Sequence, residues 1–143
     1  WDEPDFLLID MPPGTGDIQL TIVQTISLTG ALIVTTPQEV ALIDARKAIS
    51  MFDKVNVSIM GLVENMAWFE CEHGTRYPIF GEGGGAAEAK KLKLPLLGQI
   101  PINIPTREQG DAGTPVALID PAENDASAAF AALATSVDQI AQS

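Results

Sequence analysis

An aspartate of a kind that can bind a metal ion ends an apolar run near the start of the chain. Asp10 ends the stretch FLLID at residues 6–10, and the turn residues Pro12, Pro13 and Gly14 follow. At the carboxyl end of a buried strand, such an aspartate lies where α/β proteins gather ligands, and it can hold Mg²⁺ through water. The same carboxylate can instead only cap the turn that ends its strand. Both interpretations are open on the residues alone.

Two further positions in the middle of the chain carry polar chemistry. Asn65 ends an apolar run, and its amide offers one donor and one acceptor, although asparagine is also a frequent turn residue. Cys71 is the single cysteine, and His73 follows two residues later. The thiolate and imidazole can bind a metal, or both can be plain loop residues, because two soft ligands seldom make a closed site.

Apolar periodicity predicts the elements that position these residues. Strands are predicted at residues 6–10, 31–36, 57–65 and 95–101, and helices at residues 18–28, 39–52 and 85–92. Asp17 is expected to cap the first helix. Strands that alternate with helices predict an α/β fold, a parallel sheet with helices on both faces, in one domain over residues 1–143.

The last third of the chain continues with helices. Residues 107–116 predict a short helix closed by Gly113 and Pro115. From Asp120 onward the sequence has no lysine or arginine, and apolar residues recur at three- and four-residue steps. This spacing predicts a helix that packs one apolar stripe on the domain.

Composition sets limits on location and partners. The 143 residues hold 8 Lys and Arg against 19 Asp and Glu, a net charge of -11. Such a charge repels phosphate backbones, so nucleic acid is not expected as a partner. No apolar run approaches the roughly 20 residues of a membrane helix, so no membrane partner is expected either. One cysteine excludes an internal disulfide and suits a reducing compartment, the cytoplasm.

Several quoted segments together resemble a known family. DFLLIDMPPGTGD, VTTPQEVALIDARKAISMF, GLVENMAWF, IFGEGGG, LGQIPI and GTPV occur in order through residues 5–116. They resemble the Mrp/ApbC family of iron-sulfur cluster carrier ATPases, which belongs to the deviant P-loop class with the MinD and ParA proteins. The resemblance implies a P-loop NTPase fold that uses ATP and Mg²⁺.

The resemblance also implies roles for individual residues. Asp10 matches the family's catalytic Walker B aspartate, expected to bind Mg²⁺ through water. Asn65 matches an asparagine that recognises adenine, and Pro101 falls in the loop expected to flank the base. The segment that matches switch II, which senses the γ-phosphate, consists of Pro12, Pro13, Gly14, Thr15, Gly16 and Asp17.

The phosphate-binding half of the family pattern is absent from this sequence. Such ATPases carry a glycine-rich lysine loop (Walker A) and a switch I aspartate upstream, and the glycine cluster at residues 81–85 has no Lys-Ser or Lys-Thr after it. That cluster predicts a flexible entry to the next helix. The chain is therefore expected to be the carboxyl-terminal portion of an ATPase and not to hydrolyse ATP alone. Residues 6–10 should then close against residues 31–36, or two chains should pair edges.

Cys71 departs from the family in a second way. Family members carry a Cys-x-x-Cys pair, and two such pairs in a homodimer supply four thiolates to a 4Fe-4S cluster. Cys71 matches the first cysteine, and His73 and Gly74 stand where the second is expected. Three interpretations compete: a cluster ligand completed by His73 or an outside ligand, a site for another metal shared with His73, or no metal.

The resemblance implies a function for the parent protein. It is ATP-dependent binding of an iron-sulfur cluster and its delivery to apoproteins by a homodimer. A first alternative is a positioning or assembly ATPase like ParA and MinD, without a cluster. A second is a non-catalytic dimerisation module that acts only by protein contact.

Overall fold

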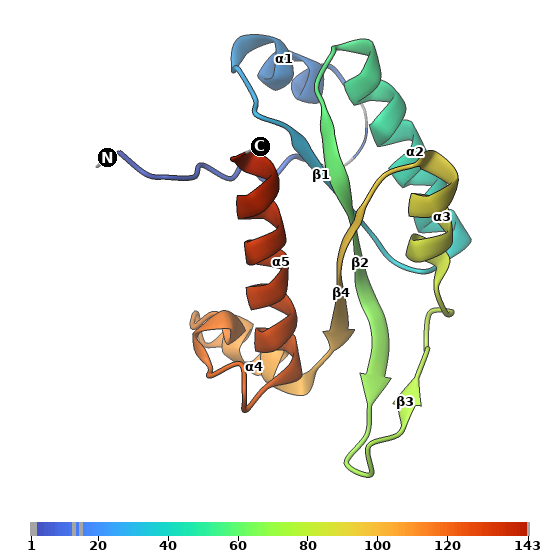
Figure 1. The fold of residues 1–143 in the computed structure, drawn as a ribbon, viewed down its shortest axis with the longest axis vertical. Coiled ribbons are helices and arrows are strands. Elements are labelled where there is room, and N and C mark those ends of the chain that lie inside the picture. Colours follow the sequence, from blue (N-terminus) through green and yellow to red (C-terminus); the bar gives the residue numbers. More distant parts are fainter. Residues whose placement is uncertain (1–2, 13, 15, 143) are drawn as a thin grey trace.

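A four-stranded sheet with β2 at its centre organises the molecule (Figure 1). The computed structural model describes residues 3–12, 14 and 16–142. β1 (Ala31–Thr35) and β4 (Leu96–Ile102) pair in parallel with opposite edges of β2 (Ile59–Glu70). β3 (Arg76–Tyr77) is short and antiparallel, and it forms a hairpin with the end of β2.

Helices cover both faces of this sheet, as predicted. α2 (Glu39–Lys54) and α3 (Gly84–Leu92) pack on one face, and α5 (Asp125–Ala141) packs on β4 from the other (Figure 1). α1 (Asp17–Thr25) precedes β1, while α4 (Ile104–Asp111) and the 3-10 turn η1 (Val116–Leu118) connect β4 to α5. In the described part of the chain, no helix has both the length and the apolar character of a bilayer crossing.

The core lies between the sheet and the helices α1, α2 and α3. Leu62, at the centre of β2, has no exposed surface. Around it pack buried apolar side chains from the neighbouring strand and helices: Val23, Ala31, Ile33, Ala45, Ile49, Met51, Phe52 and Ala89. Because these elements meet in one cluster, they hold the carboxyl ends of β1 and β2 in fixed relation.

The predicted strand at residues 6–10 is wrong. The segment is extended but forms no ladder with any described residue, and Phe6, Leu7 and Leu8 are 49%, 61% and 79% exposed. An apolar run becomes a strand only when a neighbour satisfies its backbone groups. Residues 6–10 therefore do not close against β1 as expected, and pairing of edges between two chains stays a prediction.

Element ends differ from the predictions where local capping decides them. Gly16, not Asp17, is the N-cap of α1, and Asp17 lies in the first turn, where its charge still favours the helix. α4 starts earlier than residue 107 because Asn103 caps it, accepting the backbone N–H of Thr106 at 3.2 Å. The helix ends at Asp111, before the predicted end at residue 116, and η1 follows at Val116–Leu118.

The glycine cluster at residues 81–85 allows the start of α3 to pack closely on the sheet, and the predicted flexible entry to this helix is wrong. A Cβ at Gly84 would lie 2.2 Å from the backbone oxygen of Pro37, which follows β1. A Cβ at Gly85 would lie 2.7 Å from a carboxylate oxygen of Glu64. The start of α3 is therefore pressed against the ends of β1 and β2, and only glycine fits there.

Candidate functional site

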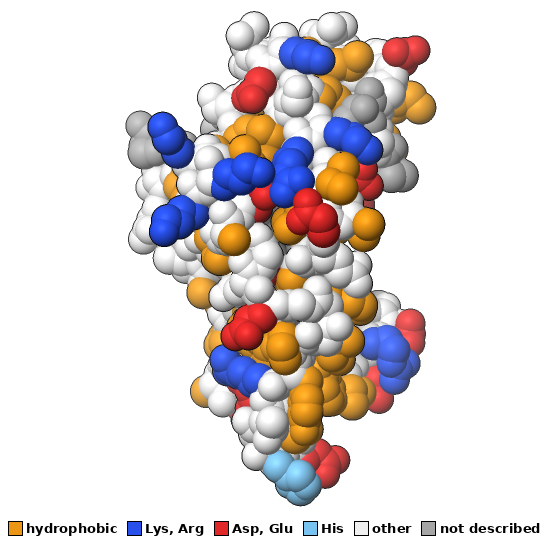
Figure 2. Space-filling model, turned by 90° about the vertical axis from the view of Figure 1, so that its right-hand side faces the viewer, with side chains coloured by type: hydrophobic (Ala, Val, Ile, Leu, Met, Phe, Trp, Pro, Cys, Tyr) orange, Lys and Arg blue, Asp and Glu red, His pale blue; other side chains and the backbone are white. Residues whose placement is uncertain are grey.

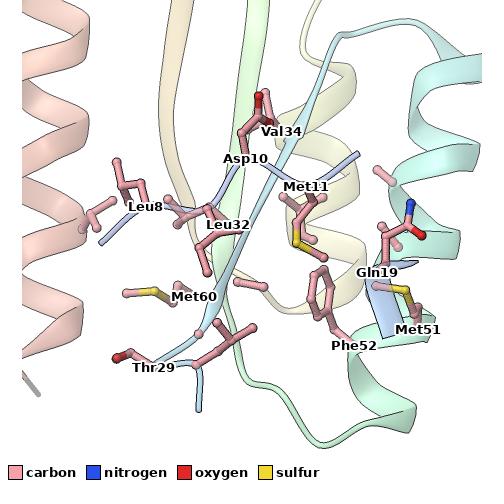
Figure 3. Close-up of a pocket in the computed structure, with 18 of the residues that line it drawn as sticks. Leu8, Asp10, Met11, Gln19, Thr29, Leu32, Val34, Met51, Phe52 and Met60 are labelled. Atoms are coloured by element: carbon pink, nitrogen blue, oxygen red, sulfur yellow. The ribbon is translucent and has the colours of Figure 1, made fainter. Parts of the chain in front are cut away.

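A hollow of about 1610 Å³ lies along the free edge of β1. The amino-terminal segment, β1 and the last turns of α5 line it. Figure 3 shows Leu8 turned toward α5, Met11 turned toward Phe52, and Asp10 beside Val34. Apolar side chains therefore line much of the hollow, and Asp10 lies near the carboxyl end of β1.

Asp10 and Asn65 both line this hollow, so the structure brings together two of the predicted site residues. The Asp10 side chain is exposed. The side-chain oxygen of Asn65 accepts the backbone N–H of Met66 at 2.9 Å. The side-chain amide nitrogen has no hydrogen-bond partner among the described residues, which leaves it able to donate to a ligand. Met66 has a left-handed backbone with φ 56, a conformation that costs energy for a non-glycine residue.

The turn after Asp10 is held by a residue that the sequence did not single out. Gln19 of α1 is buried, and its amide nitrogen donates to the carbonyl of Pro12 at 2.9 Å. Gly14 has φ +97, which side chains rarely adopt. Two members of the predicted switch II segment, Pro13 and Thr15, lie outside the described residues.

Pro101 is separated from the other predicted nucleotide contacts. Asn65 pairs with Ile100, so Pro101 stands on the strand next to Asn65. Pro101 is buried, however, and it lines a second cavity rather than the hollow that holds Asp10. Its role beside a base stays a prediction.

The charges around the hollow do not by themselves fit a nucleoside triphosphate. Four aspartates and one lysine line it, and Lys47 is paired with Asp44 at 2.9 Å. Phosphoryl groups are held by cations and by backbone N–H groups in nucleotide enzymes. The described residues offer a carboxylate for a hydrated metal ion and an amide for a base edge, but no cradle for the phosphates.

Cys71 lies directly after β2, in the turn of the β2–β3 hairpin. Its backbone N–H donates to the carbonyl of Thr75 at 3.0 Å, and Gly74 donates to the Cys71 carbonyl at 2.9 Å. Backbone N–H groups of His73 and Thr75 point at the sulfur, and the Thr75 and Tyr77 side chains add weaker hydrogen bonds. These donors lower the pKa of the half-buried Cys71 thiol below its ordinary value and favour the thiolate.

A second cavity of about 530 Å³ opens beside this thiol. Cys71 and His73 line it from the hairpin, and residues 101–105 line it from the other side. Among the described residues, no group of three or more histidine, cysteine, aspartate or glutamate side chains is placed to hold a metal ion. A metal or cluster at Cys71 would therefore need ligands from outside the described residues.

Buried acids behind the site were also missed by sequence analysis. Glu64 is 1% exposed; it accepts the backbone N–H of Gly85 and, at 2.6 Å, the side-chain amide of Gln99. Arg46 holds the buried Glu88 with two hydrogen bonds of 2.7 and 2.6 Å and reaches Glu39 at 2.9 Å. Arg46 thereby lowers the pKa of Glu88. Asp44 and Lys47 form a surface pair at 2.9 Å.

The parallel sheet with helices on both faces places the chain, by its likeness to solved structures, in the class of P-loop NTPases related to MinD. The solved nucleotide-binding protein of Archaeoglobus fulgidus in complex with ADP is 44% identical, with a TM-score of 0.68 over 76% of this chain and 45% of that one. The cell division ATPase MinD of Pyrococcus furiosus is 26% identical, with a TM-score of 0.60 over 78% of this chain and 43% of that one.

Within this class, the chain belongs to the ParA family, whose model, described as "NUBPL iron-transfer P-loop NTPase", matches residues 1–138. The iron-sulfur cluster carrier protein of Haemophilus influenzae is 52% identical over 138 residues. That match covers 96% of this chain and 37% of the relative. The chain thus spans well under half the length of this relative.

Proposed function

We propose that the protein containing this chain binds an iron-sulfur cluster at Cys71 and delivers it to apoproteins, in an ATP-dependent cycle. The observation that carries the proposal is the Cys71 thiol, half-exposed in a hairpin turn and activated by backbone N–H donors. Family membership and relatives named as cluster carriers support the same function. They favour it over a positioning ATPase without a cluster.

A homodimer is part of the proposal because one chain supplies too few ligands. Cys71 and His73 from each of two chains make two thiolates and two imidazoles, and iron-sulfur centres with two cysteine and two histidine ligands are known. The cluster is cargo, so its ligands must be accessible for exchange, which fits an exposed hairpin turn. A free thiol of this kind also suits the reducing cytoplasm.

ATP and Mg²⁺ enter the proposal through the parent protein rather than through this chain alone. Asp10 would hold the hydrated metal ion, Asn65 would contact the base, and Pro12 and Gly14 belong to the turn that would sense the terminal phosphate. Pro101 keeps its proposed place near the base. The phosphate-binding residues must come from sequence outside these 143 residues, so the chain alone should bind nucleotide weakly.

The test is anaerobic reconstitution with ferrous iron and sulfide. The protein should gain the visible absorbance of a cluster, bind iron and sulfide at one cluster per two chains, and shift from monomer to dimer in size-exclusion chromatography. Cys71→Ser should lose the absorbance, and His73→Ala should lose it if the imidazole is a ligand. Full cluster absorbance in Cys71→Ser would contradict the proposal.

A further inference from the structure

The cavity beside Cys71 is a groove between two separate parts of the chain. The hairpin forms one wall with Phe69 and Cys71. The end of β4 with Ile102 and the start of α4 with Ile104 form the other. Its volume of about 530 Å³ falls within the range of roughly 300–1,000 Å³ that is usual for ligand sites. The groove can therefore take a few side chains of a partner but not a folded domain.

The groove combines an apolar wall with an acidic rim. Ile104 lines the groove and is 57% exposed, so it offers apolar surface to an occupant. Glu72 and Asp125 line the rim, and neither has an ion pair within the described residues. Figure 2 shows the single histidine, His73, at the tip of the molecule with an acidic side chain beside it.

None of the lysine and arginine residues in the described part of the chain forms an ion pair with Glu72 or Asp125 of the rim. Six of the eight Lys and Arg residues lie on α2 or α3 or cap α3: Arg46, Lys47, Lys54, Lys90, Lys91 and Lys93. The other two are already paired close to the groove: Arg76 of the hairpin pairs at 2.7 Å with Glu70, which also lines the groove, and Arg107 of α4 pairs with Asp111 at 2.9 Å. Neither cation pairs with Glu72 or Asp125. The rim therefore attracts a partner with positive charge.

We propose that this groove binds an extended segment of the cluster acceptor, in which lysine or arginine residues alternate with apolar side chains. The proposal rests on the proposed function, because it is the nearness of Cys71 that makes the occupant an acceptor. An acceptor held here has its cysteines next to the cargo.

The handover that such docking serves is a ligand exchange. Acceptor thiolates replace the Cys71 thiolates on the iron atoms, and the protons that the acceptor thiols lose pass to solvent or to the released Cys71 sulfur. No electron is transferred, so no external oxidant or reductant is needed. Holding the acceptor in the groove raises the local concentration of its thiols at the cluster.

The first test measures binding alone, by fluorescence anisotropy of a fluorescein-labelled peptide that alternates lysine with isoleucine. It should bind, weaken with added salt, and bind about fivefold more weakly to the Glu72→Gln, Asp125→Asn double variant. The control double variant Asp53→Asn, Glu82→Gln removes the same charge elsewhere and should bind normally. Ile104→Ser should also weaken binding. Equal binding to both double variants, or of a peptide with glutamate for lysine, would overturn the proposal.

The second test separates the groove from the cluster site. Cys71→Ser should lose cluster absorbance yet keep peptide binding, while the Glu72→Gln, Asp125→Asn variant should keep its cluster. With loaded protein, the lysine-isoleucine peptide should slow cluster transfer to the apo form of a ferredoxin that takes the same type of cluster. Transfer that the bound peptide does not slow would overturn the assignment of the groove to acceptors, whereas absent cluster loading contradicts the proposed function instead.

Discussion

Replacing Gly84 with alanine tests how firmly α3 is seated on the ends of β1 and β2. The added Cβ would lie 2.2 Å from the Pro37 oxygen, 2.9 Å from its carbonyl carbon and 3.0 Å from its Cα. All three are backbone atoms, which cannot turn aside as a flexible side chain can. The helix start or the loop after β1 must therefore move.

Two effects of opposite sign determine how much Gly84→Ala changes the free energy of unfolding. Alanine favours a helix over glycine by at most about 1 kcal/mol, and less at the first turn. Relief of the contact requires a backbone shift of about 1 Å, and insertion of a methyl group into a packed site costs about 1–3 kcal/mol. We expect Gly84→Ala to lower the free energy of unfolding by about 2 kcal/mol.

Urea denaturation followed by tryptophan fluorescence measures this change. At the slopes usual for small domains, the midpoint should fall by about 1 M. Gly110→Ala is the matched control, because Gly110 is also helical and its Cβ would meet nothing within 4 Å. That variant should be neutral or slightly stabilised. If Gly84→Ala and Gly110→Ala behaved alike, the close packing of α3 would be refuted.

Three further predictions concern the core, the buried ion pair and the thiol. Leu62→Ala should lower the free energy of unfolding by about 3 kcal/mol in the same assay, because Leu62 is 0% exposed. Arg46 lowers the pKa of Glu88 in the folded protein, so the Arg46–Glu88 pair contributes its full stability at pH values above the ordinary glutamate pKa. That contribution is lost as the pH falls through the lowered pKa of Glu88, where the carboxylate becomes protonated. Glu88→Gln should therefore flatten the acid part of the stability profile, and an unchanged profile would contradict this. The double variant Thr75→Val, Tyr77→Phe should shift the pH profile of Cys71 alkylation by iodoacetamide upward, because side-chain donors to the sulfur are removed.

The sequence predicted the parts of the fold that depend on local periodicity. The apolar runs of β1, β2 and β4, the helices α2, α3 and α5, and the placement of helices on both faces follow from such patterns. Residues 6–10 show the limit, because the same kind of run stays unpaired where no neighbour is available. β3 was missed because two residues carry no periodic signal.

The candidate site was predictable only where single residues carry it. Asp10 and Asn65 were singled out at the ends of apolar runs and Cys71 as the single cysteine, and the structure places the first two around one hollow. Their functional roles stay predictions. The burial of Glu64 and Glu88 had no sequence signal, because it depends on partners far along the chain. Gln99 lies 35 residues from Glu64, and Arg46 lies 42 residues from Glu88. Such contacts are fixed by tertiary packing, not by local propensity.

The hollow and the Cys71 hairpin are joined by β2, and the irregular part of this strand lies between them. Asn65 and Cys71 are six residues apart, which spans about 20 Å along β2. Up to Glu64 the strand is held on both edges by β1 and β4. The β4 register then breaks between Asn65 and Phe69, where Met66 adopts φ 56. A strained residue of this kind can relax when a neighbour changes its contacts. A ligand that uses the side-chain oxygen of Asn65 would compete with the Met66 N–H for it, so its binding would act directly on the residue where the pairing with β4 breaks.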